Sequence, residues 1–73
     1  METKLELFSQ RLRELRKEAK ATQKEMAVYL DCTDRHYQKI EYGQVNVPAT
    51  TLIALSQYFH VSTDYLLGLR DQR

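Results

Sequence analysis

Apolar residues recur at helical spacing along the first twenty positions of the chain. The stripe has a period near 3.6 residues and consists of Leu5, Phe8, Leu12, Leu15 and Ala19. Charged residues occupy many of the positions between its members, as expected for the solvent side of an amphipathic helix. The pattern predicts a first helix from about Lys4 to about Ala19.

The pattern changes between Thr22 and Gly43, where it predicts two shorter helices joined by a tight turn. Thr22 and Glu25 have the spacing of a capping box. The apolar face behind this cap consists of Met26, Ala27 and Leu30. The periodicity stops at residues 31–32, which we therefore expect to form the turn.

The second of these short helices begins at Thr33, a residue type that commonly serves as an N-cap. Asp34 suits the positive end of the new helix dipole. Tyr37 and Ile40 are the apolar positions of this helix, and Gly43 is a natural C-cap residue. Because helices this short cannot bury their apolar faces alone, the rest of the chain must supply a core.

Apolar residues resume after Pro48, which suits the first turn of a helix because its missing N–H costs nothing there. We expect this helix to end near His60. Its inward stripe is expected to comprise Leu52, Ile53, Ser56 and Phe59, widened by Leu55 and Tyr58. Ser62 then caps a last short helix that stops at Gly68, and the polar tail 70–73 is expected to fray.

Length and composition fit one domain over residues 1–73, an all-α fold built as a compact bundle of five short helices. The chain has 73 residues, of which 42% are hydrophobic, with two Gly and one Pro. A single Cys excludes an intramolecular disulfide, which favours the reducing cytoplasm. The first ten residues lack the apolar run of a signal peptide, and no segment is long enough to span a membrane.

Charge is unevenly distributed, although the net charge is only +1. The basic cluster consists of Arg11, Arg13, Arg16, Lys17, Lys20, Lys24, Arg35 and Lys39. Between residues 47 and 69 the only formal charge is Asp64. Such asymmetry is expected of a small DNA-binding module, but taken alone it is better explained by solvated helix faces.

The segment 22–43 resembles the DNA-binding helix-turn-helix of the phage repressor and Cro-like family, of the Xre type. The residues that carry the likeness within the motif are Gln23, Ala27, Leu30, Thr33, Tyr37, Ile40, Glu41 and Gly43. The likeness continues to Pro48 and to the closing segment 61–68, VSTDYLLG, so it covers roughly residues 5–69. Two positions depart from the family. Asp31 stands where Gly is usual, in a turn that needs positive φ, and Tyr37 replaces a smaller aliphatic residue.

The resemblance implies that the helix 33–42 is a recognition helix that lies in the major groove of double-stranded DNA. On a helical wheel, Tyr37 and Ile40 point toward the core. The side chains on the other side are Asp34, Arg35, Gln38, Lys39 and Tyr42. These are the groups that such a helix would bring to the bases and to the phosphates.

Candidate base contacts follow from the donors and acceptors of these side chains. Arg35 can donate two hydrogen bonds to O6 and N7 of a guanine, and Lys39 can reach similar acceptors. Gln38 is compatible with adenine. Asp34 either accepts from the N4 amine of cytosine or serves only as a first-turn residue that the helix dipole favours.

Phosphate contacts are expected from Gln23 and Thr33, which stand at helix N-termini, although each also has a purely structural role there. Tyr42 and Gln44 are weaker candidates for phosphate contact. His36 flanks the recognition helix, where we expect a phosphate contact rather than catalysis.

The resemblance also pairs Arg16 with Glu41. The pair is either a bidentate ion pair that fixes the approach of the recognition helix or a surface salt bridge of about 0–1 kcal/mol. The sequence leaves both readings open.

The apolar residues after Pro48 exceed what a helix packed on one side requires. The surplus comprises Leu55, Tyr58, Tyr65, Leu66, Leu67 and Leu69. The resemblance implies a twofold homodimer through residues 52–69, which would place two recognition helices about 34 Å apart. The alternative is that most of these residues complete the core of the monomer.

The sequence lacks patterns for other kinds of chemistry. Cys32, His36 and His60 are the only soft or imidazole ligands, and their spacing matches no zinc site. The sequence contains no Gly-rich phosphate loop. We therefore expect no metal, no cofactor, no small-molecule ligand, no membrane partner and no enzymatic activity.

The combined expectation is a cytoplasmic, bacterial or phage-encoded transcriptional regulator that acts as a dimeric repressor on an inverted-repeat DNA operator. Two alternatives stay open. The first is an antitoxin or a restriction-modification controller protein of the same fold. The second is a helical protein–protein adaptor that does not bind DNA.

Overall fold

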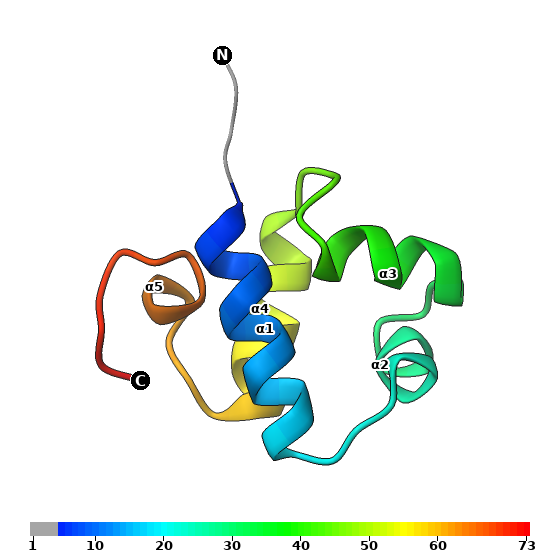
Figure 1. Ribbon diagram of the computed structural model, residues 1–73, viewed down its shortest axis with the longest axis horizontal. Helices are drawn as coiled ribbons and strands as arrows, with labels where there is room; N and C mark the ends of the chain where they lie inside the picture. Colours follow the sequence, from blue (N-terminus) through cyan, green and yellow to red (C-terminus); the bar gives the residue numbers. More distant parts are fainter. Residues whose placement is uncertain (1–4) are drawn as a thin grey trace.

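Five α-helices follow one another in the computed structural model, which describes residues 5–73 (Figure 1). Their bounds are α1 Glu6–Glu18, α2 Gln23–Tyr29, α3 Asp34–Glu41, α4 Ala49–Phe59 and α5 Thr63–Leu66. The prediction of an all-α bundle of five short helices is confirmed. The predicted start of the first helix at Lys4 lies outside the described residues. No helix within the described range is long and apolar enough to cross a membrane.

The helix starts are set by the three predicted N-caps. The hydroxyl of Thr22 accepts from the backbone N–H of Glu25 at 3.0 Å, and the Glu25 carboxylate accepts from the backbone N–H of Thr22, which completes the capping box. Thr33 caps α3 in the same way, and Ser62 caps α5. Local side-chain chemistry therefore defines where α2, α3 and α5 begin.

Three helix ends use a left-handed residue that is not glycine. Lys20, Asp31 and His60 each have φ of 56° and follow α1, α2 and α4, respectively. The positive φ expected at Asp31 is confirmed. A side chain in this region costs about 1–2 kcal/mol relative to glycine, somewhat less for Asp. These sharp ends let each following segment turn back onto the bundle.

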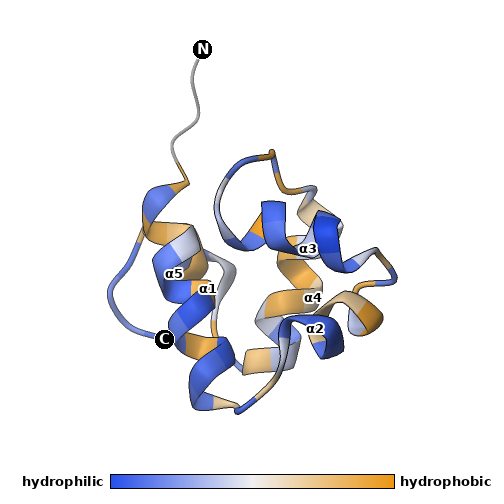
Figure 2. Cartoon of the chain, turned by 45° about the vertical axis from the view of Figure 1, so that its right-hand side comes forward, coloured by the Kyte–Doolittle hydropathy of each residue, from blue (hydrophilic) through white to orange (hydrophobic). Residues whose placement is uncertain are grey.

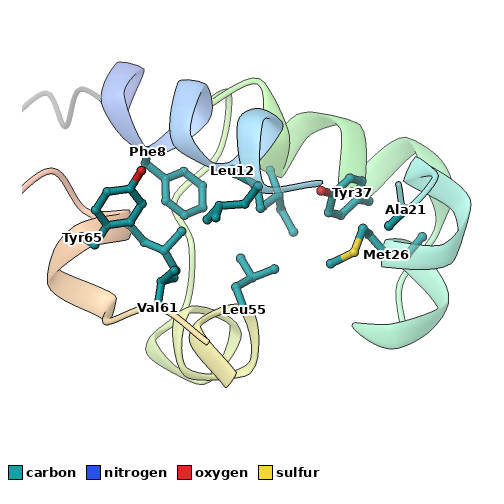
Figure 3. Packing of buried hydrophobic residues seen from close by; sticks show 12 residues of the cluster. Phe8, Leu12, Ala21, Met26, Tyr37, Leu55, Val61 and Tyr65 are labelled. Carbon is teal, nitrogen blue, oxygen red and sulfur yellow. The ribbon is translucent and has the colours of Figure 1, made fainter. Parts of the chain in front are cut away.

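The core lies where α1 meets the other helices. α1 packs against α3 and α5, while α2 packs against α3 and α4 against α5. Figure 3 shows Phe8 and Leu12 directed from α1 toward Leu55 and Val61, with Tyr37 and Met26 at the other end of the cluster. One continuous apolar cluster therefore joins all five helices.

The predicted inward stripe of α4 is wrong at Ile53. Ile53 is 50% exposed, whereas Leu55 is fully buried at the centre of the interface with the rest of the bundle. Two residues apart on a helix are about 200° apart around its axis, so these side chains cannot share one face. Ala19, expected at the end of the first stripe, is also exposed because it lies beyond the last residue of α1.

The polar tail 70–73 is held in place, which contradicts the expectation that it frays. Arg11 on α1 donates from Nη1 to the carbonyl of Tyr65 at 2.5 Å and to that of Arg70 at 2.7 Å. The backbone N–H of Ser62 donates to the carbonyl of Arg73 at 3.0 Å. Figure 1 shows the tail curving round α5. Buried hydrogen bonds to a charged side chain oppose the fraying expected of a polar terminus.

Candidate functional site

α2 and α3 form a tight pair because the turn between them is closed by backbone hydrogen bonds. The N–H of Cys32 donates to the carbonyl of Ala27 at 2.9 Å, and the N–H of Asp31 donates to that of Val28 at 3.1 Å. Ala27 is 1% exposed, and its small side chain allows the two helices to approach closely. α3 is thereby held across α2 at a defined angle.

α3 has one buried face and one open face. Tyr37, Ile40 and Glu41 are buried, and the ring of Tyr37 lies in the core. The exposed side chains of this helix are Asp34, Arg35, His36, Gln38 and Lys39. In Figure 2 the visible side of α3 is mostly hydrophilic. The helix is thus anchored from below and presents a row of polar groups to solvent.

The cations on the open face are not used inside the protein. Within residues 5–73, neither Arg35 nor Lys39 takes part in an ion pair. Both side chains are exposed and stand four residues apart, so they lie on the same side of α3. They are available to an external acceptor.

A buried carboxylate joins α3 to α1 and α2. The side chain of Glu41 is fully buried, and its Oε1 accepts from Nε of Arg16 at 2.9 Å. Arg16 also donates from Nη1 to the carbonyl of Ala21 at 3.0 Å, and Ser9 donates to the backbone carbonyl of Glu41. The structure thus places Arg16 and Glu41 in a buried ion pair through a single nitrogen, which is neither bidentate nor a surface salt bridge.

Gln23 contacts the same carboxylate from the first turn of α2. Its Nε2 donates to Oε2 of Glu41 at 3.1 Å, and its Oε1 accepts from Nε2 of Gln38 at 3.4 Å. Gln23 therefore links the buried ion pair to the open face of α3. Sequence reasoning missed this link, because the residues are 18 and 15 positions apart and no local pattern connects them.

The hydroxyl of Tyr37 lies beside this network without joining it. It is the one buried side-chain oxygen or nitrogen in the described part of the chain without a hydrogen-bond partner. Burial, and after it the negative charge of Glu41, raises the pKa of Tyr37 well above its usual value. Tyr37 therefore stays neutral at physiological pH and acts as part of the core.

The C-terminal end of α3 carries a second polar group. Tyr42 is 51% exposed, and the guanidinium of Arg13 on α1 lies 5.8 Å from the centre of its ring. At the other end of the helix, the hydroxyl of Thr33 accepts from the N–H of His36 at 3.0 Å, so its capping role is occupied. A tyrosine hydroxyl and an arginine thus flank one end of the open face.

Arg11 does not contribute to this face, although its charge belongs to the same basic cluster in the sequence. Its side chain is 11% exposed, and its guanidinium lies 4.2 Å from the centre of the Tyr65 ring. The basic first helix is therefore divided by function: Arg11 holds α5 and the tail, whereas Arg13 lies next to α3.

Other chemistry-bearing residues are not brought together. Within residues 5–73, no three His, Cys, Asp or Glu side chains are grouped so that they could hold a metal ion. Cys32 is half-buried, and burial raises the pKa of its thiol. Two surface hollows of about 230 and 260 Å³ are lined by residues outside α3.

Comparison with protein families gives a match over most of the chain. A family model described as Helix-turn-helix matches residues 12–66. This range contains α2, α3 and α4 in full and ends at the last residue of α5.

Similar proteins are found in Bacillus subtilis (strain 168). The chain is 35% identical over 65 residues to the uncharacterized HTH-type transcriptional regulator YobD, covering 89% of this chain and 58% of YobD. It is 41% identical over 61 residues to the HTH-type transcriptional regulator ImmR, covering 84% of this chain and 48% of ImmR. The chain thus spans about half the length of these curated relatives.

A solved structure has the same arrangement of helices. The restriction-modification controller protein C.AhdI from Aeromonas hydrophila superposes with a TM-score of 0.74 and 29% sequence identity. The superposition covers 85% of this chain and 94% of the other.

Proposed function

Since the chain belongs to the helix-turn-helix family of phage repressor and Cro-like proteins, we propose that it is a sequence-specific transcriptional regulator that binds double-stranded DNA through α3. One observation carries the proposal. α3 is anchored by the buried Tyr37, Ile40 and Glu41, while Arg35 and Lys39 are exposed on its other side. An anchored helix with an open polar face is what insertion into the major groove requires.

The proposed DNA-facing residues divide into base readers and backbone contacts. The full set is Gln23, Thr33, Asp34, Arg35, His36, Gln38, Lys39 and Tyr42. Arg35 and Lys39 read guanine O6 and N7. Asp34 stands in the first turn of α3, where it either accepts from cytosine N4 or balances the helix dipole.

Contacts to phosphate set the register of the protein on DNA and supply much of the affinity. Thr33 and His36 lie at the N-terminal end of α3, where backbone N–H groups favour an anion. Tyr42 offers its hydroxyl at the other end, and the nearby Arg13 adds positive charge there.

A homodimer would place two copies of α3 on successive turns of the major groove. Within the predicted interface 52–69, exposed apolar area remains at Ile53, Leu67 and Leu69. Leu55, Tyr65 and Leu66 are buried in the monomer, so the proposed interface is smaller than the apolar surplus in the sequence suggested. The matching operator is an inverted repeat with half-sites about 34 Å apart, and the proposed activity is repression.

A restriction-modification controller is a second candidate within the same class. The similarity in fold to C.AhdI over most of both chains favours it. The distinction from a phage-type repressor rests on the neighbouring genes, because a controller is expected beside a methyltransferase gene and an antitoxin beside a toxin gene.

Selection of bound fragments from random duplex DNA tests the proposed function. We expect an enriched motif with twofold symmetry, and an affinity that falls steeply as salt concentration rises. Failure to enrich any motif, together with binding that is insensitive to salt, would reject DNA binding and favour the protein–protein adaptor.

A further inference from the structure

We infer that Gln23 is a positioning residue that sets Gln38 to read adenine, and that it is not primarily a phosphate ligand. The inference rests on the proposed function and adds a specific base contact to it. It starts from a continuous chain of hydrogen bonds that runs from Arg16 through Glu41 and Gln23 to Gln38.

The inner end of this chain fixes the amide of Gln23. Carboxylate oxygens accept hydrogen bonds and do not donate them, so Oε2 of Glu41 must face the Nε2 group of Gln23. The reverse orientation would bring two acceptor oxygens together around a carboxylate that is fully buried. Because Arg16 holds the other oxygen of the same carboxylate, the Gln23 amide has one favourable orientation.

The outer end of the chain fixes Gln38 in turn. The oxygen of Gln23 points away from Glu41 and only accepts, so Gln38 must present its Nε2 group to it. Gln38 retains its own oxygen and one remaining N–H for an external partner. This combination of one acceptor and one donor matches N6 and N7 of adenine in the major groove.

The same contact limits Gln23 as a ligand for phosphate. One N–H of its amide is occupied by Glu41, and its oxygen, which a phosphate would repel, is the atom turned toward Gln38. Gln23 is also only partly exposed, whereas Gln38 is exposed on the open face of α3. The geometry therefore favours an action of Gln23 through Gln38.

The discriminating variant is Gln23→Lys. A lysine still donates to Glu41 and adds a positive charge that suits phosphate, but it has no acceptor for Gln38. Gln23→Leu removes both hydrogen bonds, and Gln38→Leu removes the proposed reader. Gln57→Leu on the exposed side of α4 makes the same chemical change away from α3 and serves as the matched control. Thermal unfolding establishes that each variant is folded.

Each folded variant is then titrated with the DNA sequence selected by the wild type and with single-base substitutions of it. We expect Gln38→Leu to reduce the preference for adenine at one position by roughly five- to a hundredfold. Gln23→Lys should reduce the preference at that same position by at least about threefold. The double variant Gln23→Lys/Gln38→Leu should discriminate no less than Gln38→Leu alone, and Gln57→Leu should match the wild type.

Two results would overturn the inference while leaving the proposed function intact. In the first, Gln38→Leu or Gln23→Lys leaves every base preference unchanged. In the second, Gln23→Leu weakens binding equally to all sequences and makes the salt dependence shallower, as loss of a phosphate contact does. If Gln23→Leu does not fold, Gln23→Lys alone decides between these results. Wild-type protein that selects no DNA sequence would instead reject the proposed function itself.

Discussion

The carboxylate of Glu41 on α3 is completely buried, and Arg16 on α1 donates to it from Nε at 2.9 Å. The pair ties the recognition helix to the first helix, since Arg16 also donates to the carbonyl of Ala21 just before α2. A charge buried in this way depends on its partner, because removing the partner leaves it without compensation.

Arg16→Met should therefore lower the free energy of unfolding by about 3 kcal/mol. Lys17→Met, at an exposed position on the same helix, should change it by less than about 0.5 kcal/mol. Urea denaturation of both variants and the wild type measures the difference. Equal stabilities of the two variants would mean that Glu41 is neutral or finds another partner.

Tyr37→Phe should leave the free energy of unfolding unchanged or raise it by about 1 kcal/mol. The hydroxyl of Tyr37 is buried without a partner in the described part of the chain, so its removal relieves a desolvation penalty. Tyr42→Phe, which removes an exposed hydroxyl, serves as the comparison. A loss of more than about 1 kcal/mol in Tyr37→Phe would show that the hydroxyl makes a hydrogen bond in solution.

Local features of the fold could be predicted from the sequence because they depend on neighbouring residues. The caps at Thr22, Thr33 and Ser62 and the positive φ at Asp31 follow from side-chain chemistry within a few positions. The burial of Ile40 follows from helical periodicity.

Features that depend on distant contacts could not be predicted in the same way. Leu55 and Ile53 are both large and apolar, and only the packing of α4 on the bundle decides that Leu55 faces inward. The tail is held by Arg11, which is 59 residues from Arg70 in sequence. The contact between Gln23 and Gln38 likewise exists only after α2 and α3 have packed.

His60→Gly should raise the free energy of unfolding by about 1 kcal/mol, because glycine adopts a φ of 56° without strain. Asp31→Gly should give a smaller gain, since Asp tolerates this region better than His. Thermal unfolding compares both variants with Gln57→Gly, which should lose about 1 kcal/mol in the middle of α4. A loss of stability in His60→Gly would mean that the imidazole makes a favourable contact.

Arg11→Met should release the tail and lower the free energy of unfolding by about 2 kcal/mol. The guanidinium of Arg11 is mostly buried and bonds the carbonyls of both Tyr65 and Arg70. Hydrogen exchange at the amide of Ser62, which donates to Arg73, measures the release directly. Arg13→Met should leave this exchange rate unchanged, and an unchanged rate in Arg11→Met would show that the tail is held by other contacts.

Arg35→Ala and Lys39→Ala should each weaken binding to the selected DNA by about 1–3 kcal/mol and relax the base preference at one position. Both side chains are exposed on the open face of an anchored helix, so their loss should leave the free energy of unfolding nearly unchanged. Arg70→Ala removes the same charge from the tail, away from α3, and controls for the change in net charge.

Quantitative gel-shift titrations on the selected sequence and its single-base variants separate loss of specificity from loss of charge. A purely electrostatic role predicts that all three variants weaken binding to every sequence alike. A base-reading role predicts that Arg35→Ala and Lys39→Ala affect different single positions, while Arg70→Ala affects none. Base preferences that survive both substitutions on α3 would rule out this helix as the reader of the sequence.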